Sequence, residues 1–156
     1  MNSFERAKEI INKILYLTIA TVDKEGQPWN TPVYTAFDED YNFYWASDQN
    51  GQHSKNIAQN SKVFLVIYDS TAPEGTGEGV YIQAKASILT SEDELQKALR
   101  YLYKRKNQQP GKGEAKEFLG DYPRRIYKAV PEKVWLNGDG EVNGNYIDIR
   151  IEVKLL

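Results

Sequence analysis

The chain has 156 residues, of which 40% are hydrophobic, so it can bury one core and is not typical of a disordered protein. Its formal net charge of -2 argues against a dedicated nucleic-acid binder, because such proteins present a basic domain. The absence of cysteine and the single histidine, His53, exclude disulfides, thiolate metal sites and His-rich metal sites. Ser-His-Asp catalysis would have to run through His53 alone. The N-terminal segment lacks the apolar core of a signal peptide, and no apolar run approaches a membrane span. We therefore expect one cytoplasmic domain over residues 1–156, with neither a nucleic-acid nor a membrane partner.

The first third of the chain predicts a helix followed by a β-hairpin. Residues 3–14 place apolar side chains at helical spacing, with Ser3 as a plausible N-cap. Residues 15–23 are rich in β-branched side chains, and Asp23–Gly26 supplies turn chemistry. A second strand follows over residues 28–37.

Pro32 lies inside that second strand. A proline cannot donate to a sheet ladder, so it belongs on an edge, at a bulge or at a strand start. One interpretation is a strand that is open on one side at 30–32, with neighbouring backbone groups free for a ligand. A simple bulge or a ligand-free edge explains the proline equally well.

The next segment combines an aromatic strand with a candidate anion site. Residues 42–47 form the strand, and the polar turn 48–54 leads into a helix around 55–59 with Ser54 as its expected N-cap. Free N–H groups, a serine hydroxyl, Lys55 and the nearby His53 would together bind an anion. A solvated turn before a surface helix is the alternative.

The remaining chain predicts four strands and two helices. The capping box Ser91-Glu-Asp-Glu94 starts one helix, which ends in the basic run 104–106. That run could reach a phosphate, although a solvated helix end explains it as well. Residues 137–145 lack the central glycine of a calcium loop and indicate a hairpin turn. The expected elements are strands over 62–67 and 80–89, helices over 91–106 and 114–120, a strand over 125–136 interrupted at Pro131, and a half-buried strand over 146–155. Long strands joined by tight turns favour a mainly β (α+β) antiparallel barrel with peripheral helices over a parallel α/β sheet.

Over residues 17–88 the sequence resembles the FMN-binding split-barrel family related to pyridoxamine 5'-phosphate oxidase. The residues that carry the resemblance are Ala20-Thr21, Gly26-x-Pro28, Pro32-Val33, the strand end Tyr44–Ser47, Ser54-Lys55 with Ile57, Lys62-Val63, and Ile82-x-Ala-x-Ala86. The pieces are weak one by one, but their order and spacing are fairly specific.

The resemblance implies a six-stranded antiparallel split β-barrel (Greek key) that forms a homodimer with FMN at the subunit interface. It assigns the flavin ring to Pro32, Val33, Tyr34 and Thr35, with Val33–Thr35 offering backbone groups. It places Trp45, Ala46 and Ser47 along the site, and the phosphate at His53, Ser54 and Lys55. Aromatic strands around Trp29 and Tyr44 are candidates for the dimer interface.

Two departures from the oxidase pattern affect the function. The Ser-Arg-Lys phosphate motif reads His53-Ser54-Lys55 here, so its arginine is missing. No histidine follows His53, so the C-terminal Arg-x-His that holds pyridoxal phosphate is absent, and we do not expect oxidation of pyridoxamine phosphate. The resemblance thus implies a flavin-dependent oxidoreductase without an identified catalytic side chain. The alternatives are a non-catalytic module that binds a flavin or a deazaflavin, and a dimer without a cofactor. Haem ligation is not expected, because there is no cysteine and His53 is assigned to the phosphate.

Overall fold

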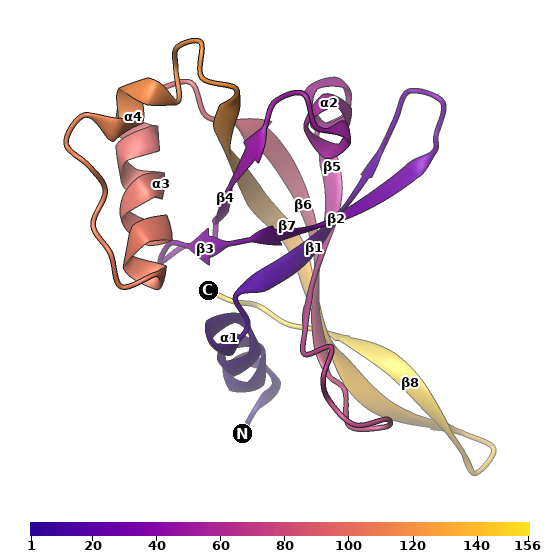
Figure 1. Ribbon diagram of the computed structural model, residues 1–156. Helices are drawn as coiled ribbons and strands as arrows, with labels where there is room; N and C mark the ends of the chain where they lie inside the picture. The colour runs from indigo at the N-terminus through magenta and orange to yellow at the C-terminus, as the bar shows by residue number, and fades with distance from the viewer.

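The computed structural model describes residues 1–156 as an antiparallel sheet with four helices around it (Figure 1). The elements in chain order are α1 (Ser3–Lys13), β1 (Tyr16–Val22), β2 (Pro28–Tyr34), β3 (Ala36–Phe37), β4 (Phe43–Asp48), α2 (Gln52–Gln59), β5 (Lys62–Tyr68), β6 (Gly79–Ile88), α3 (Glu92–Arg105), α4 (Glu114–Glu117), β7 (Arg124–Val142) and β8 (Asn145–Glu152). None of the helices has both the length and the apolar character that a membrane span requires.

The strands follow the order β2-β1-β5-β6-β7-β4-β3, and β8 pairs only with β7. The predicted strand over residues 28–37 breaks at Thr35 into β2, which pairs with β1, and β3, which pairs with β4. Counted as one strand, β2 and β3 complete a six-stranded barrel with β1, β4, β5, β6 and β7. The hydrogen-bonded sheet is not closed, because β2 and β4 are not paired along their length. The split antiparallel barrel is therefore confirmed, with β8 as an addition outside it.

Alternation along the strands builds two cores, one on each side of β4. Phe43 and Trp45 point into the barrel, where they pack with residues such as Leu17 and Leu65. Tyr44 and Ala46 point outward into a second cluster beneath α3. Tyr44 is only 2% exposed, so its side chain is not available to a dimer interface. It packs with side chains of α3, where Tyr101 stacks on its ring.

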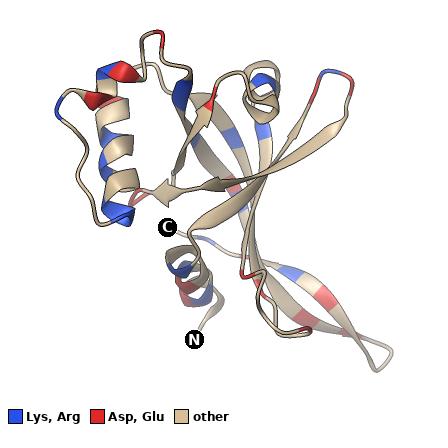
Figure 2. Cartoon of the chain, viewed as in Figure 1, with Lys and Arg blue, Asp and Glu red and all other residues tan.

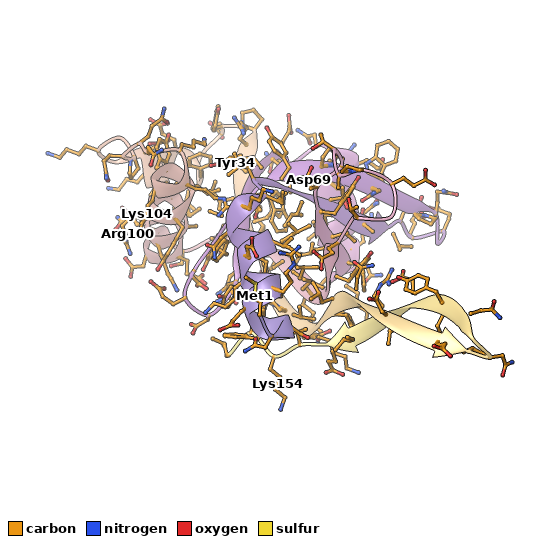
Figure 3. All side chains as sticks on the ribbon, turned by 90° about the horizontal axis from the view of Figure 1, so that it is seen from below. Met1, Tyr34, Asp69, Arg100, Lys104 and Lys154 are labelled. Atoms are coloured by element: carbon orange, nitrogen blue, oxygen red, sulfur yellow. The ribbon has the colours of Figure 1, made fainter.

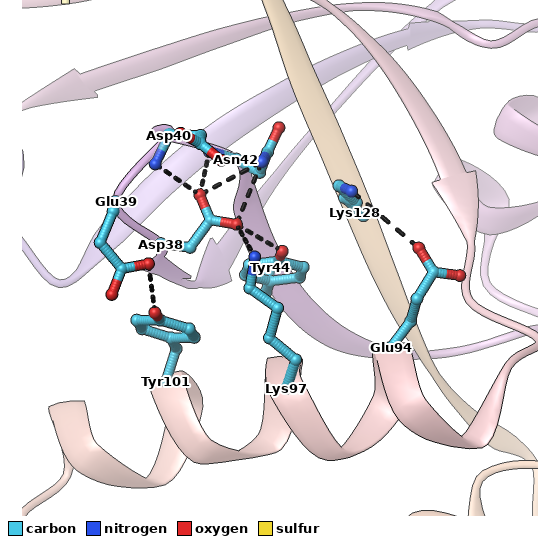
Figure 4. A network of polar contacts seen from close by, with 9 residues as sticks. All are labelled: Asp38, Glu39, Asp40, Asn42, Tyr44, Glu94, Lys97, Tyr101 and Lys128. Atoms are coloured by element: carbon cyan, nitrogen blue, oxygen red, sulfur yellow. Dashed lines mark hydrogen bonds and ion pairs between the residues drawn. The ribbon is translucent and has the colours of Figure 1, made fainter. Parts of the chain in front are cut away.

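Asp38 fixes α3 to the β3–β4 turn (Figure 4). Its carboxylate accepts hydrogen bonds from Asn42 N–H at 2.9 Å, from the Tyr44 hydroxyl at 2.8 Å and from Lys97 Nζ at 2.8 Å. Burial opposes the charged form, but the hydrogen bonds from Lys97, Asn42 and Tyr44 outweigh it and lower the pKa of Asp38 to about 2. Next to it, the Tyr101 hydroxyl donates to Glu39, which raises the pKa of Tyr101 to about 12.

Several predicted boundaries differ from the observed ones for local reasons. The N-cap of α1 is Asn2, in a reciprocal capping box with Glu5, rather than Ser3. Helix α2 begins at Gln52 with Gly51 as N-cap, so Ser54 lies inside its first turn. The predicted interruption of β7 at Pro131 is confirmed, because the β6–β7 register shifts there.

The prediction that the C-terminal strand is half-buried is wrong. All eight residues of β8 are exposed, and only Val153 and Leu155 beyond its end reach the core. The alternation does predict a strand, but β7 continues past the barrel and carries β8 away from it as a projecting hairpin (Figure 1).

Candidate functional site

The split of the barrel is an open seam between β2 and β4. The free edge of β2 lies on one side, because β2 is the end of the sheet. On the other side, β4 pairs with β3 only at Tyr44 and Phe43, so its residues from Trp45 to Asp48 lack a partner there. The two ring-binding segments predicted from the sequence, Pro32–Thr35 and Trp45–Ser47, therefore flank the same opening.

The register of β1 and β2 shows which backbone groups face the seam. Thr35 N–H donates to the Leu15 carbonyl at 3.0 Å, and Asp23 N–H donates to the Gln27 carbonyl at 3.1 Å. Since bonded and non-bonded pairs alternate in antiparallel ladders, the odd-numbered residues of β2 bond to β1 and the even-numbered ones face outward. Pro32 thus occupies a position where no ladder donor is needed, which confirms the open edge rather than a bulge.

This alternation changes which backbone groups a ligand can reach. Asn30 and Tyr34 direct their N–H and C=O groups to the free edge, whereas Val33 and Thr35 direct theirs toward β1. Asn30 was not among the predicted site residues, although its even spacing from Pro32 could have identified it. Of the three backbone donors expected from the sequence, Tyr34 alone faces the seam.

The side chains of the two segments that flank the seam alternate between the barrel interior and the outer face. Those of Val33, Thr35, Trp45 and Ser47 are buried. Tyr34 and Ala46 point outward and line a cavity of about 410 Å³ between the barrel and the α3–α4 layer. The other residues of this cavity are Tyr16, Leu99, Leu102, Tyr103, Lys106, Glu114, Glu117, Phe118, Tyr122, Arg124 and Ile126. A cavity of this size, lined by aromatic and aliphatic side chains with a few charged ones, is typical of a small-molecule site.

Two cations outside the predicted set of site residues border this cavity. Lys106 Nζ lies 5.3 Å from the ring centres of both Tyr34 and Tyr103. Arg124 lies at the end of β7 that pairs with Asp48. The basic sequence around each of them was the available signal, but only the fold brings both to the cavity that Tyr34 lines.

The start of α2 has the features of an anion site. Its N-cap, Gly51, supplies no side-chain hydrogen bond, so the first N–H groups of the helix have no capping partner. Ser54 is 2% exposed, and its hydroxyl has no hydrogen-bond partner. Lys55 is exposed and belongs to none of the ion pairs of the structure. Uncapped N–H groups and an unpaired cation together favour a bound anion.

Ser54 and His53 differ in their suitability for that anion. Ser54 lies beside Tyr127, whose pKa is raised by burial and lowered in part by Ser54, so its hydroxyl faces the interior. His53 Nε2 is 2.8 Å from Ser47 Oγ, which links α2 to the seam end of β4. Burial lowers the pKa of His53, so the ring is neutral at pH 7 and supplies no positive charge. Lys55 is therefore the principal cation of this helix start.

Comparisons with known proteins agree with this fold. The family described as pyridoxamine 5'-phosphate oxidase matches residues 3–138. No curated protein sequence matches the chain.

Among solved structures, the protein Atu2129 of Agrobacterium tumefaciens is 17% identical, with a TM-score of 0.71 over 87% of this chain and 56% of its own. A haem-binding protein from Mycobacterium smegmatis is 17% identical, with a TM-score of 0.70 over 96% of this chain and 58% of its own. An F420 reductase is 18% identical, with a TM-score of 0.58 over 81% of this chain and 94% of its own. The chain thus spans little more than half the length of the first two.

At these identities the structural matches establish the fold, and the sequence match over residues 3–138 establishes the family. The chain belongs to the pyridoxamine 5'-phosphate oxidase family.

Proposed function

We propose that the chain binds FMN at the seam, as a homodimer, and acts as a flavin-dependent oxidoreductase. The observation that carries the proposal is that three separate parts of the chain meet there: the free edge of β2, the unpaired end of β4 and the uncapped start of α2. The His53–Ser47 contact joins the last two directly.

The residues at the seam fit the two halves of the cofactor. Lys55 and the first N–H groups of α2 would hold the phosphate, which carries nearly two negative charges. The free backbone groups of Tyr34 would meet the polar edge of the ring, and the cavity lined by Tyr34 and Ala46 has room for a flat ring system. When bound, the flavin supplies the redox chemistry, and the protein orients it and controls access of water.

A flavin- or deazaflavin-binding module without turnover is the second candidate. The similarity to an F420 reductase supports the deazaflavin, which shares a flat ring and a phosphate with FMN. Haem is less well supported, because a haem iron needs a protein ligand and the only histidine is hydrogen-bonded to Ser47.

A homodimer would cover apolar surface that the barrel leaves exposed. Even-numbered residues of β1 and β5 share the outer face, where Tyr16 is 57%, Phe64 37% and Tyr68 47% exposed. Trp29, on the open strand β2, is 49% exposed. Permanent interfaces commonly bury more than about 2,000 Å² in total. Light scattering at micromolar concentration should give the mass of a dimer.

The proposal is tested by titrating the purified protein with FMN, riboflavin and F420, following flavin fluorescence and the absorption spectrum. We expect tight binding of FMN and weaker binding of riboflavin, which lacks the phosphate. Preference for F420 would select the deazaflavin, and no binding of any of the three would refute the proposal. Addition of reduced nicotinamide cofactors and an electron acceptor then separates an oxidoreductase from a binding module.

A further inference from the structure

The β7–β8 hairpin projects from the barrel without covering it. Beyond Leu136, β7 pairs with β8 alone, and both strands have a free edge (Figure 1). We call residues 139–152 the hairpin arm. The family match ends at residue 138, before the hairpin arm begins. An isolated two-stranded hairpin is marginally stable in water.

The two faces of the hairpin have opposite character. One face is polar and internally bonded, with Arg150 donating to Asp148 at 2.6 Å and the Tyr146 hydroxyl donating to Asp139 at 3.1 Å. The other face carries Ile147, Ile149 and Ile151, each 37–39% exposed. No element of the protomer covers this apolar face.

The isoleucine side chains of β8 lie across two glycines of β7. A Cβ added at Gly138 would lie 2.4 Å from Ile151 Cδ1, and one added at Gly140 would lie 2.8 Å from Ile149 Cγ2. The space above each glycine is therefore filled by an isoleucine side chain of the same hairpin. Ile147, Ile149 and Ile151 form a continuous apolar strip along this face, open to a partner.

Charge indicates which surface of a second chain it is. The hairpin arm has four carboxylates and one arginine, net -3. Residues 97–125, which form most of α3, α4 and their loops, have nine cationic and three acidic side chains, net +6. We call this segment the basic unit. The two lie at opposite ends of the protomer (Figures 2 and 3), so one chain cannot bring them together.

The basic unit also has the apolar surface that the isoleucines require. Leu119 and Tyr122 are 42% and 45% exposed, and Lys116 and Arg124 flank them in the sequence. Neither cation forms an ion pair within the protomer. We propose that the hairpin arm of one protomer docks on the basic unit of a second copy of this chain. The inference rests on the homodimer of the proposed function and adds a contact outside the barrel face.

Charge reversal on each side tests the contact. The arm variant carries Glu141→Lys and Glu152→Lys, and the unit variant carries Lys112→Glu and Lys116→Glu; all four side chains are exposed. By sedimentation at low salt, each variant should raise the dimer dissociation constant about tenfold, because interfacial charge reversal replaces attraction with repulsion. Combining all four changes should restore the wild-type value, and raised salt should diminish every effect. The matched control is Glu25→Lys, an exposed carboxylate in the β1–β2 turn, which should leave the constant unchanged.

Cross-linking provides a second measurement that does not depend on affinity. The chain has no cysteine, so Glu141→Cys chains can be mixed with Lys116→Cys chains and treated with a bismaleimide. A cross-link between the two different chains is expected, and none when Glu25→Cys replaces Glu141→Cys. An unchanged dissociation constant in both reversal variants, or failure of the combined variant to recover, would overturn the docking while leaving a barrel-face dimer intact. A monomer under all conditions would overturn both, and FMN titration would then show whether the flavin proposal survives alone.

Discussion

Two polar regions of this protein, the Asp38 cluster and the start of α2, differ in whether their groups are satisfied within the chain. Asp38 is 2% exposed, and both of its oxygens accept hydrogen bonds from Asn42 and other partners. At the start of α2 the first N–H groups have no cap and Lys55 has no counter-ion. Buried polar groups are normally paired, so the first region is complete as it stands and the second is suited to a ligand.

Because of this difference, we expect changes in the Asp38 cluster to affect stability and changes at the start of α2 to affect ligand binding. The Asp38 cluster links the β3–β4 turn to α3, and removing it should loosen the fold without discriminating between ligands. The exposed Lys55 side chain forms no ion pair within the chain, so removing it should change ligand affinity without changing stability.

Asp38→Ala should lower the free energy of unfolding by about 3 kcal/mol, because it leaves Tyr44 and Lys97 without their acceptor. The measurement is urea denaturation at pH 7, followed by far-UV circular dichroism. Asp40→Ala is the matched control, because this neighbouring carboxylate is exposed and forms no side-chain hydrogen bond. It should change stability by less than about 0.5 kcal/mol. Equal losses in the two variants would contradict a special role for the cluster.

The lowered pKa of Asp38 predicts a loss of stability in acid. A carboxyl whose pKa falls from 3.8 to about 2 on folding contributes stability that is complete above pH 4 and disappears as the pH falls through 2. The contribution is about 2.5 kcal/mol. Urea denaturation of wild type and Asp38→Asn between pH 5 and pH 2 isolates it from the other carboxylates. The two stabilities should converge as the pH falls, and a constant difference would show that Asp38 is not held in its charged form.

Lys55→Ala should weaken FMN binding roughly ten- to a hundredfold, because a charge-assisted hydrogen bond contributes about 1.5–3 kcal/mol. Riboflavin affinity and the free energy of unfolding should not change, since Lys55 is exposed and unpaired. Fluorescence titration of both flavins provides the measurement. Lys62→Ala, an exposed lysine at the start of β5, is the control. Equal losses for FMN and riboflavin would move the anion site elsewhere, with Lys106 and Arg124 at the cavity as the next candidates.

The sequence predicts this fold better than it predicts the site. Periodicity and turn residues identified nearly every strand, because an alternating pattern such as that of β6 depends on local burial. The projecting position of β8 was missed, because alternation reports that a strand has two faces and not whether the apolar one is covered. At the site, Pro32 indicated the open edge, but the direction of each backbone group depends on the register with β1. Placing Lys106 beside Tyr34 required the packing of α3 on the barrel, which no local pattern encodes.

Tyr34→Phe should have the smallest effect, and its value lies in separating backbone from side-chain recognition. The Tyr34 hydroxyl is buried without a hydrogen-bond partner, and burial raises the pKa of the side chain. Deleting a buried group that makes no hydrogen bond removes a desolvation cost rather than a contact. The variant should therefore be at least as stable as wild type in urea and should bind FMN with unchanged affinity, because the backbone groups of residue 34 still face the seam. Tyr16→Phe, on the facing ring of the same aromatic pair, is the matched control. A large loss of FMN affinity in Tyr34→Phe alone would show that the hydroxyl turns toward the flavin when it binds, and that the ring is not held by backbone groups alone.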